Sequence, residues 1–270
     1  MHPMLNTAIS AARKAGDIIS RYSDRVDQLD IKEKEQSDFV SQVDKMAEAA
    51  IIDTIRYAYR DHSILAEESG RHKGDSVFEW VIDPLDGTTN YLYGIPQYAV
   101  SIALLREGKL YQSVIYDPSK GDLFTASKGQ GAMLNNKRIR VSARRSIENA
   151  LLVTGIPYKA SQDMDLFLQT LKALVPGTAG IRRPGSAALD LAYVAAGRYD
   201  GFWEFGLNKW DIAAGVLLVQ EAGGLIGDMM GGDTHMESGD IVAASPKVFR
   251  DMQKRIHPII KSSLASQEAV

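Results

Sequence analysis

The chain has 270 residues, with 31 lysine and arginine residues against 34 aspartate and glutamate residues, and it contains no cysteine. Its formal net charge of −3 gives no strong nucleic-acid signal, and its 45% hydrophobic content is typical of a globular protein. The lack of cysteine excludes disulfide scaffolds, iron–sulfur clusters, thiolate zinc sites and a cysteine nucleophile. No apolar segment is long enough to span a membrane and no signal peptide is visible, so we expect a cytoplasmic protein without membrane partners.

Two amphipathic helices are predicted at the start of the chain. Apolar residues recur at helical spacing over residues 4–22 and again over residues 41–59, whereas the polar residues 23–37 are expected to form an exposed loop. The pattern then changes to short strands separated by Gly, Pro and Asp. These strands are predicted at Ser63–Ala66, Phe78–Ile82, Ala99–Leu105, Gln112–Tyr116 and Leu123–Ala126.

From about residue 140 onward, strands and helices alternate. The predicted strands are Ala150–Val153 and Asp240–Ala244. The predicted helices are Met164–Leu174, Ser186–Ala196, Asp211–Ala222 and a last one that begins at Pro246 and frays after residue 262. We therefore expect an α+β half over residues 1–140 and an α/β half over residues 141–270. No composition shift marks a linker, so both halves are expected to share one compact body.

The densest group of carboxylates follows a hydrophobic strand, in Trp80-Val-Ile-Asp-Pro-Leu-Asp-Gly-Thr-Thr-Asn90. Pro84 is expected to end the strand because it cannot donate to a sheet, and Gly87 permits a sharp turn. Asp83 and Asp86 can then converge on one point, with the Leu85 carbonyl as a neutral ligand. Oxygen ligands without histidine suit Mg²⁺, and the amides after Asp86 favour a phosphate group. The alternative is that both aspartates only cap a turn.

Other catalytic signatures are missing or fit poorly. The five histidines do not stand at metal-ligand spacing, and the chain has no Walker A motif, no Gly-x-Ser-x-Gly elbow and no complete Gly-x-Gly-x-x-Gly. Haloacid-dehalogenase phosphatases use a second aspartate two residues after the first, but Leu85 occupies that position here. A covalent aspartyl-phosphate mechanism is therefore not expected.

These motifs resemble the inositol monophosphatase family of Mg²⁺-dependent, lithium-sensitive phosphatases. The segment from Trp80 to Asn90 looks like its first signature, and Trp210-Asp-Ile-Ala-Ala-Gly215 looks like its second. Between them, Gly185-Ser-Ala-Ala188 is also similar to the family. The resemblance covers nearly the whole chain. It implies an αβαβα layered sandwich, built from an antiparallel-sheet half and an α/β half, and a homodimer.

The resemblance also implies roles for individual residues. Two or three Mg²⁺ ions would be held by Glu67, Asp83, Leu85, Asp86 and Asp211. The phosphate would meet the amides of Gly87 and Thr88, and a polyol would meet Ser186, Ala187 and Glu204. The catalytic residues would be Thr88, Asp44 and Glu67, which hold an attacking water, while Lys34 would lie on a mobile loop. Hydrolysis would be direct, and Li⁺ would inhibit by competing for one Mg²⁺ position.

Several of these residues also have a simpler interpretation. Glu67 belongs to an adjacent acidic pair that is typical of a solvated loop, and Lys34 is typical of a charged surface. Asp44 can complement a helix dipole, and Asp211 can serve as an N-cap. Glu204, without the resemblance, would be a charge at a strand edge.

The resemblance leaves the substrate and the biological role open. Inositol 1-phosphate and related polyol monophosphates are expected, with fructose 1,6-bisphosphate or 3′-phosphoadenosine 5′-phosphate as alternative substrates. The segment from Arg182 to Gly197 looks like the bacterial SuhB subgroup, which is associated with RNA polymerase and Nus antitermination factors. Arg182 and Arg183 are candidates for that partner surface, or else a structural pair or a dimer contact.

Overall fold

The computed structural model describes residues 2–23, 31–35, 38–157 and 162–267, without the side chains of residues 31–41 and 266–267. Two helices, α1 (Pro3–Tyr22) and α2 (Gln42–Ala58), cover one face of a large sheet. This sheet has the strand order β10-β9-β8-β7-β6-β5-β3-β4. Its strands are β3 (Ser63–Ala66), β4 (Gly70–His72), β5 (Phe78–Asp86), β6 (Ala99–Arg106), β7 (Lys109–Asp117), β8 (Asp122–Ser127), β9 (Gly131–Leu134) and β10 (Lys137–Arg138).

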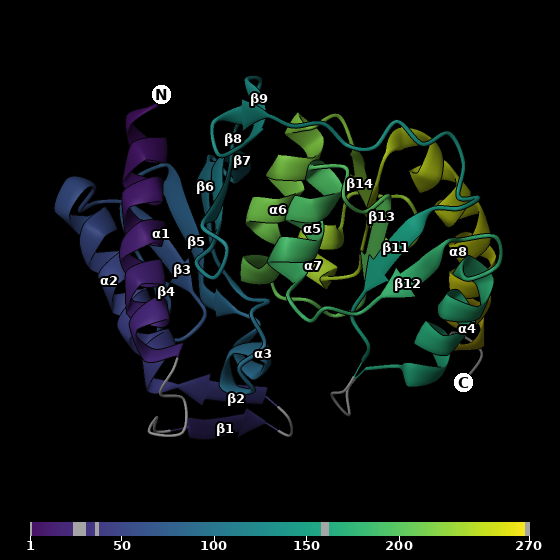
Figure 1. Cartoon of the computed structure of the whole chain (residues 1–270), viewed down its shortest axis with the longest axis horizontal. Coiled ribbons are helices and arrows are strands. Elements are labelled where there is room, and N and C mark those ends of the chain that lie inside the picture. Colours follow the sequence, from purple (N-terminus) through teal and green to yellow (C-terminus); the bar gives the residue numbers. More distant parts are fainter. Residues whose placement is uncertain (1, 24–30, 36–37, 158–161, 268–270) are drawn as a thin grey trace.

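A second sheet of five strands lies in the other part of the molecule, in the order β12-β11-β13-β15-β14. Its strands are β11 (Leu151–Thr154), β12 (Gly180–Arg182), β13 (Gly201–Glu204), β14 (Leu225–Gly227) and β15 (Ile241–Ala244). Helices α5 (Ala187–Ala195) and α6 (Lys209–Glu221) lie between the two sheets, and α4 (Met164–Leu174) and α8 (Pro246–Gln267) cover the outer face (Figure 1). The predicted αβαβα sandwich is therefore confirmed.

Both sheets are mixed. The large sheet is antiparallel except where β3 runs parallel to β5, so the expectation of a purely antiparallel sheet is wrong at that edge. In the second sheet β11 runs parallel to β12 and β13, whereas β15 pairs antiparallel with β13 and β14. Short elements complete the described chain: α3 (Thr88–Leu92), α7 (His235–Ser238) and the hairpin of β1 (Ile31–Glu35) with β2 (Asp38–Ser41).

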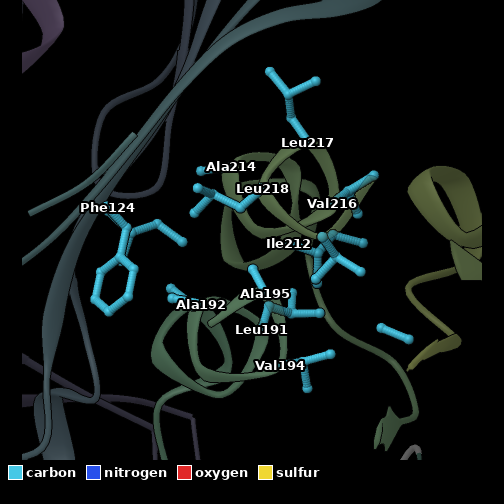
Figure 2. Close-up of a cluster of buried hydrophobic side chains, with 14 of the residues drawn as sticks. Phe124, Leu191, Ala192, Val194, Ala195, Ile212, Ala214, Val216, Leu217 and Leu218 are labelled. Atoms are coloured by element: carbon cyan, nitrogen blue, oxygen red, sulfur yellow. The ribbon is translucent and has the colours of Figure 1, made fainter. Parts of the chain in front are cut away.

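The central helices have no polar face. Every residue of α6 from Ile212 to Val219 is buried, because the helix packs between two sheets rather than against one (Figure 2). A helix that is apolar all round needs such a fully enclosed position. In contrast, α1 buries one stripe of mainly small residues against the outer face of the large sheet. No described helix has the length and hydropathy needed to cross a membrane.

Four local predictions are wrong. Residues 31–35, expected in a loop, form β1, while residues 24–30 and 36–37 of that segment lie outside the described residues. Strand β5 continues past Pro84 to Asp86, because a bulge accommodates a residue that cannot donate. Asp211 lies inside the first turn of α6, whose N-cap is Asn208. Helix α8 extends beyond residue 262 to Gln267.

Candidate functional site

A cleft of about 340 Å³ lies where β5, α5, α6 and β13 meet. Of the described residues that line it, six are acidic and Arg183 alone is cationic. The acidic residues are Glu67, Asp83, Asp86, Asp190, Glu204 and Asp211. Segments from both sheets and from the helix layer between them therefore bring negative charge to one place.

The bulge at the end of β5 brings Asp83 and Asp86 to the cleft. Asp83 pairs with Ser101 and Asp86 with Ala99, so one residue fewer on β6 spans the same stretch. The Leu85 amide donates to Asp83 Oδ1 at 2.9 Å, which fixes the turn. Gly87 then adopts φ 96°, a left-handed conformation that favours glycine, before α3 begins.

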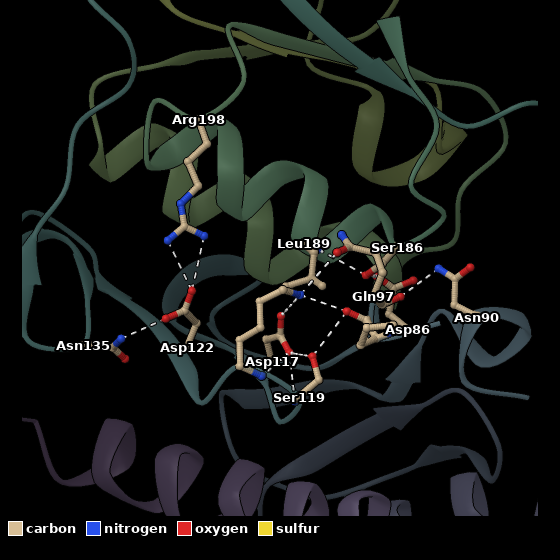
Figure 3. Close-up of polar contacts among 12 residues, drawn as sticks. Asp86, Asn90, Gln97, Asp117, Ser119, Asp122, Asn135, Ser186, Leu189 and Arg198 are labelled. Atoms are coloured by element: carbon tan, nitrogen blue, oxygen red, sulfur yellow. Dashed lines mark hydrogen bonds and ion pairs between the residues drawn. The ribbon is translucent and has the colours of Figure 1, made fainter. Parts of the chain in front are cut away.

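Asn90 joins this loop to the segment before α5. Its Nδ2 lies 2.8 Å from the Gln97 carbonyl oxygen (Figure 3). The same Nδ2 lies 2.8 Å from the carbonyl oxygen of Pro184 and 3.2 Å from that of Gly185. One side-chain amide therefore links the large sheet with the loop that leads into the central helix layer. This explains structurally why the motif extends to Asn90.

Asp86 contacts the start of α5. Its Oδ2 accepts hydrogen bonds from Ser186 Oγ at 2.6 Å and from the Ala188 amide at 2.7 Å (Figure 3). Ser186 is the N-cap of α5, and the positive end of the helix dipole faces the carboxylate. The first turn of α5 thus positions one of the predicted metal ligands.

Two residues of α2 support the opposite wall. Thr88 Oγ1 lies 2.9 Å from Asp44 Oδ1 and 3.0 Å from the Leu85 carbonyl oxygen, so its single proton has two acceptors. Glu48 accepts hydrogen bonds from the amides of Glu68 at 2.7 Å and Ser69 at 2.9 Å. These bonds fix the loop after β3 that carries Glu67.

Glu204 and Asp211 complete the acidic lining. Asp211 Oδ2 accepts a hydrogen bond from the Asn208 amide at 2.6 Å, across the first turn of α6. Glu204, at the end of β13, accepts a hydrogen bond from the Gly155 amide. A Cβ at residue 155 would overlap the Glu204 carboxyl group, so glycine is required for this close approach.

Five acids of the cleft hold their protons more strongly than isolated acids. Burial and the charges of Glu67, Asp86 and Asp211 raise the pKa of Asp83 well above its usual range. Burial likewise raises the pKa of Asp86 to about 6, although its bonds to Ser186 and Ala188 oppose the shift. Burial and the neighbouring Asp86 raise the pKa of Glu204 to about 8.

Two further acids follow the same pattern. Burial, Asp86 and Glu67 raise the pKa of Asp211, and burial, Glu204 and Asp86 raise that of Asp190. A divalent cation would relieve this repulsion, and carboxylate and carbonyl oxygens are the ligands that Mg²⁺ prefers. The donor set therefore fits Mg²⁺.

The side chains are not gathered around a point as they stand. Within the described part of the chain, no three histidine or carboxylate groups are arranged to hold one metal ion. Asp86 accepts a hydrogen bond from Ser186 and Asp211 from the Asn208 amide, so protein donors already occupy one oxygen of each carboxylate. Binding of a cation would require some of these carboxylates to rotate inward.

The structure brings most of the predicted site residues together. The cleft is lined by Glu67, Asp83, Leu85, Asp86, Gly87, Thr88, Ser186, Ala187, Glu204 and Asp211. Asp44 reaches it through Thr88. Both Arg182 and Arg183 are exposed, but only Arg183 lines the cleft. Lys34 lies in β1, and its side chain is outside the described residues.

Sequence reasoning missed four residues of the site. Asn90 was part of a motif without a role of its own, and Glu48 looked like an ordinary helix charge. Gly155 gave no signal, because its partner Glu204 is distant in the sequence. Asp190, on α5, stands in an apolar stretch, Ala187-Ala-Leu-Asp-Leu-Ala192, and an acid in such a stretch was the available signal.

Comparisons with known proteins identify relatives of this chain. The sequence profile of the inositol monophosphatase family matches residues 1–266. A Pseudomonas aeruginosa protein named Nus factor SuhB is 51% identical over 269 residues, which cover 98% of this chain and 99% of that protein.

Two solved structures are also similar. The extragenic suppressor protein suhB from Bartonella henselae superposes with a TM-score of 0.92 at 43% identity, covering 94% of this chain and 98% of that one. An inositol monophosphatase from Anabaena gives a TM-score of 0.80 at 38% identity, covering 93% and 94%. This chain therefore belongs to the inositol monophosphatase family, and within it to the SuhB subgroup.

Proposed function

We propose that the cleft binds Mg²⁺ and hydrolyses phosphate monoesters of polyols, with inositol 1-phosphate as the first substrate to test. The observation that carries this proposal is the convergence of Glu67, Asp83, Asp86 and Asp211 on one cleft. Burial raises the pKa values of Asp83, Asp86 and Asp211, and neighbouring acids add to the shifts of Asp83 and Asp211. Such a group gains stability from a cation and a phosphate that share the site.

The chain's own residues would position the reactants. Bound Mg²⁺ would supply charge neutralisation at the phosphate and acidify water. The amides of Gly87 and Thr88 would donate to phosphate oxygens. The Thr88 hydroxyl donates to Asp44, so its lone pairs are free to accept a hydrogen bond from a water molecule. Asp44 and Glu67 would then orient this water for direct attack, and Asp44 would hold its proton through Thr88.

Phosphate release from inositol 1-phosphate tests this proposal. Turnover should require Mg²⁺, fall with added Li⁺, and fall in Asp86→Asn, which keeps the shape of the side chain but removes its charge. Asp122→Asn is a matched control, because Asp122 accepts from Arg198 and Asn135 outside the cleft (Figure 3). Near-normal turnover of Asp86→Asn at saturating Mg²⁺ would contradict the ligand assignment.

The same assay decides the substrate class. Fructose 1,6-bisphosphate and 3′-phosphoadenosine 5′-phosphate are the alternative substrates, and Glu204 favours a polyol phosphate over both. A protein that released no phosphate from these compounds or from other sugar and nucleotide monophosphates would contradict the catalytic proposal.

We further propose a second function, as a Nus factor that binds the transcription machinery. The supporting observation is the name Nus factor SuhB, carried by relatives such as the Pseudomonas aeruginosa protein, and the Escherichia coli protein of that name is 49% identical over 265 residues. These names favour the regulatory role over catalysis as the main role. Arg182 and Arg183 would contribute to the partner surface, because both are exposed.

A pull-down with RNA polymerase and Nus factors tests this second function. Retention of the wild type at moderate salt, weakened in Arg182→Ala, is expected. Asp86→Asn should still be retained if partner binding does not depend on catalysis. Absence of retention of the wild type would count against the regulatory role.

A further inference from the structure

Lys120 connects the hairpin of β7 and β8 with a loop that lies beside the cleft. It stands in the turn between these two strands, and 40% of its side chain is exposed. Its Nζ lies 2.7 Å from Asp117 Oδ2, 2.9 Å from the Pro96 carbonyl oxygen and 3.4 Å from Gln97 Oε1. An ammonium group has three N–H donors, so these three acceptors use all of them. Two of the three belong to the loop before β6 and not to the hairpin itself.

The hairpin turn is closed without this ammonium group. Asp117 is fully buried, and its Oδ1 accepts hydrogen bonds from the Ser119 amide at 3.0 Å, the Ser119 hydroxyl at 2.6 Å and the Lys120 amide at 3.1 Å (Figure 3). Burial would lower the pKa of Lys120, but the hydrogen bond and the charge of Asp117 oppose this effect, and the pKa is raised. Asp117 therefore closes the turn with one oxygen and, with the other, directs a charged ammonium group toward the loop before β6.

The loop before β6 packs directly on the turn that carries Gly87. The Gln97 carbonyl oxygen accepts a hydrogen bond from Asn90 Nδ2 at 2.8 Å, and a Cβ at residue 87 would lie only 2.9 Å from this oxygen. No side chain separates the two backbones, because residue 87 is glycine. Directly after the loop, Ala99 pairs with Asp86. A displacement of the loop would therefore be transmitted to the backbone of Gly87.

We propose that Lys120 is a positioning residue for phosphate binding: it holds the loop before β6 against Gly87, and so fixes the turn whose Gly87 and Thr88 amides would meet the phosphate. This inference rests on the proposed phosphatase function and adds a residue to it. Lys120 does not line the cleft, so it acts through the loop and not by contact with the substrate. Its loss should weaken binding of the phosphate group and leave binding of the alcohol unchanged.

Titration of inorganic phosphate into the protein with Mg²⁺ measures this effect without turnover. Lys120→Met keeps the length of the side chain but has no donor. Its Kd for phosphate should rise about tenfold, because small displacements of binding groups are costly. The KM for inositol 1-phosphate should rise by a similar factor with a smaller change in kcat, as for an interaction made with substrate and transition state alike. The inhibition constant of free inositol, which has no phosphate group, should change less than about twofold.

Two further variants identify the cause of the loss. Lys120→Arg keeps a cation with N–H donors and should bind phosphate more tightly than Lys120→Met. Lys254→Met is the matched control: Lys254, on α8, also stands three residues after an acid, Asp251, at 3.8 Å, but it does not line the cleft and should leave the phosphate affinity unchanged. Thermal denaturation shows whether each variant is folded, and Lys120→Gln, which is too short to reach the loop, replaces Lys120→Met if that variant is not.

The outcomes separate the role of Lys120 from the function on which it rests. Wild-type phosphate affinity in Lys120→Met, an equal loss in Lys120→Arg or Lys254→Met, or a parallel loss of inositol binding would overturn the positioning role while the phosphatase stands. A wild type that binds phosphate but releases none from its esters would overturn the phosphatase, and the Kd values of the variants would still decide the role of Lys120. A wild type that neither binds nor releases phosphate would overturn both.

Discussion

Two regions of the molecule contain buried acids, and the surroundings shift the pKa values of these acids in opposite directions. In the loop after β14, Asp228 accepts hydrogen bonds from the amides of Met230, Gly232 and Thr234 and from the Thr234 hydroxyl. Burial alone would raise the pKa of Asp228, but these donors together outweigh it and lower the pKa. In the cleft, burial raises the pKa values of Asp83 and Asp86, and the neighbouring acids add to the shift of Asp83.

This difference separates a structural acid from a functional one. The donors around Asp228 belong to its own loop, so the carboxylate stabilises the fold by itself. Asp83 and its neighbours face one another, so their charge is unfavourable until a ligand shares it. Burial of an acid therefore does not identify a site, whereas burial without sufficient donors does.

The largest expected effect comes from exchanging one acid in each region for its amide. Asp83→Asn should reduce phosphatase activity at least about a hundredfold, because it removes a charged cation ligand. It should also raise the melting temperature of the cation-free protein, because it removes a repelling charge. Asp228→Asn should keep the activity and lower the free energy of unfolding by about 1–3 kcal/mol.

Activity assays and thermal denaturation in EDTA measure both effects. The comparison between the two regions fails if Asp83→Asn destabilises the cation-free protein as much as Asp228→Asn does. Retention of activity in Asp83→Asn would remove this residue from the ligand set.

A change at Gly155 tests the close packing on the alcohol side of the cleft. Gly155→Ala places a Cβ where the Glu204 carboxyl group lies, so this group must move. Turnover of inositol 1-phosphate should fall about tenfold or more, since small displacements of binding groups are costly in catalysis. A double-mutant cycle provides the control: in a Glu204→Ala background, Gly155→Ala should have little further effect. Additive losses would contradict this coupling.

The two regions should also respond to pH with opposite signs. On folding, the pKa of Asp86 rises from 3.8 to about 6 and that of Glu204 from 4.5 to about 8, so the folded state binds more protons across this range. These groups therefore lower the free energy of unfolding as the pH rises from about 4 to 8. Asp228, whose pKa is lowered, adds stability above its unfolded value that is lost as the pH falls.

Melting temperatures of the wild type and Glu204→Gln isolate this effect. In EDTA, the melting temperature of Glu204→Gln should exceed that of the wild type by a margin that grows as the pH rises toward 8. Saturating Mg²⁺ should reduce this margin, because the cation stabilises the acids of the cleft. A constant difference between the two proteins across this range would show that Glu204 does not hold its proton in the folded state.

Most helices and strands could be predicted from the sequence because local periodicity determines them. Two long motifs indicated the overall fold. The helix predicted at residues 164–174 has the bounds of α4, and strands β3 and β6 are found at or within one residue of their expected positions. The predicted end of β5 was wrong, because the rule that proline terminates a strand does not account for a bulge. The hairpin of β1 and β2 was missed, because its charged residues are not typical of strands.

The site was only partly predictable, for a different reason. Motifs named Asp83, Asp86 and Asp211, but the donors that orient these acids come from segments about 100 residues away in the sequence or from backbone amides. A pairing such as Gly155 with Glu204 depends on the parallel neighbours β11 and β13, which the sequence does not reveal. The residues that position a site therefore emerge only from the fold.

The smallest expected effect comes from replacing two helix N-caps, one that also contacts a cleft residue and one that does not. Ser186 caps α5 and donates to Asp86, whereas Asp163 caps α4 by accepting from the Leu166 amide at 2.8 Å and does not line the cleft. Replacement of either residue by alanine should cost about 1 kcal/mol, a shift of about 2–4 °C in Tm. Only Ser186→Ala should also change the Mg²⁺ concentration that gives half-maximal activity. It removes one of the two donors that hold Asp86 Oδ2 and leaves only the Ala188 amide, so the carboxylate turns toward the cation more easily and less Mg²⁺ should be needed. An equal change in both variants would mean that helix stability, and not the orientation of Asp86, sets the affinity for the cation.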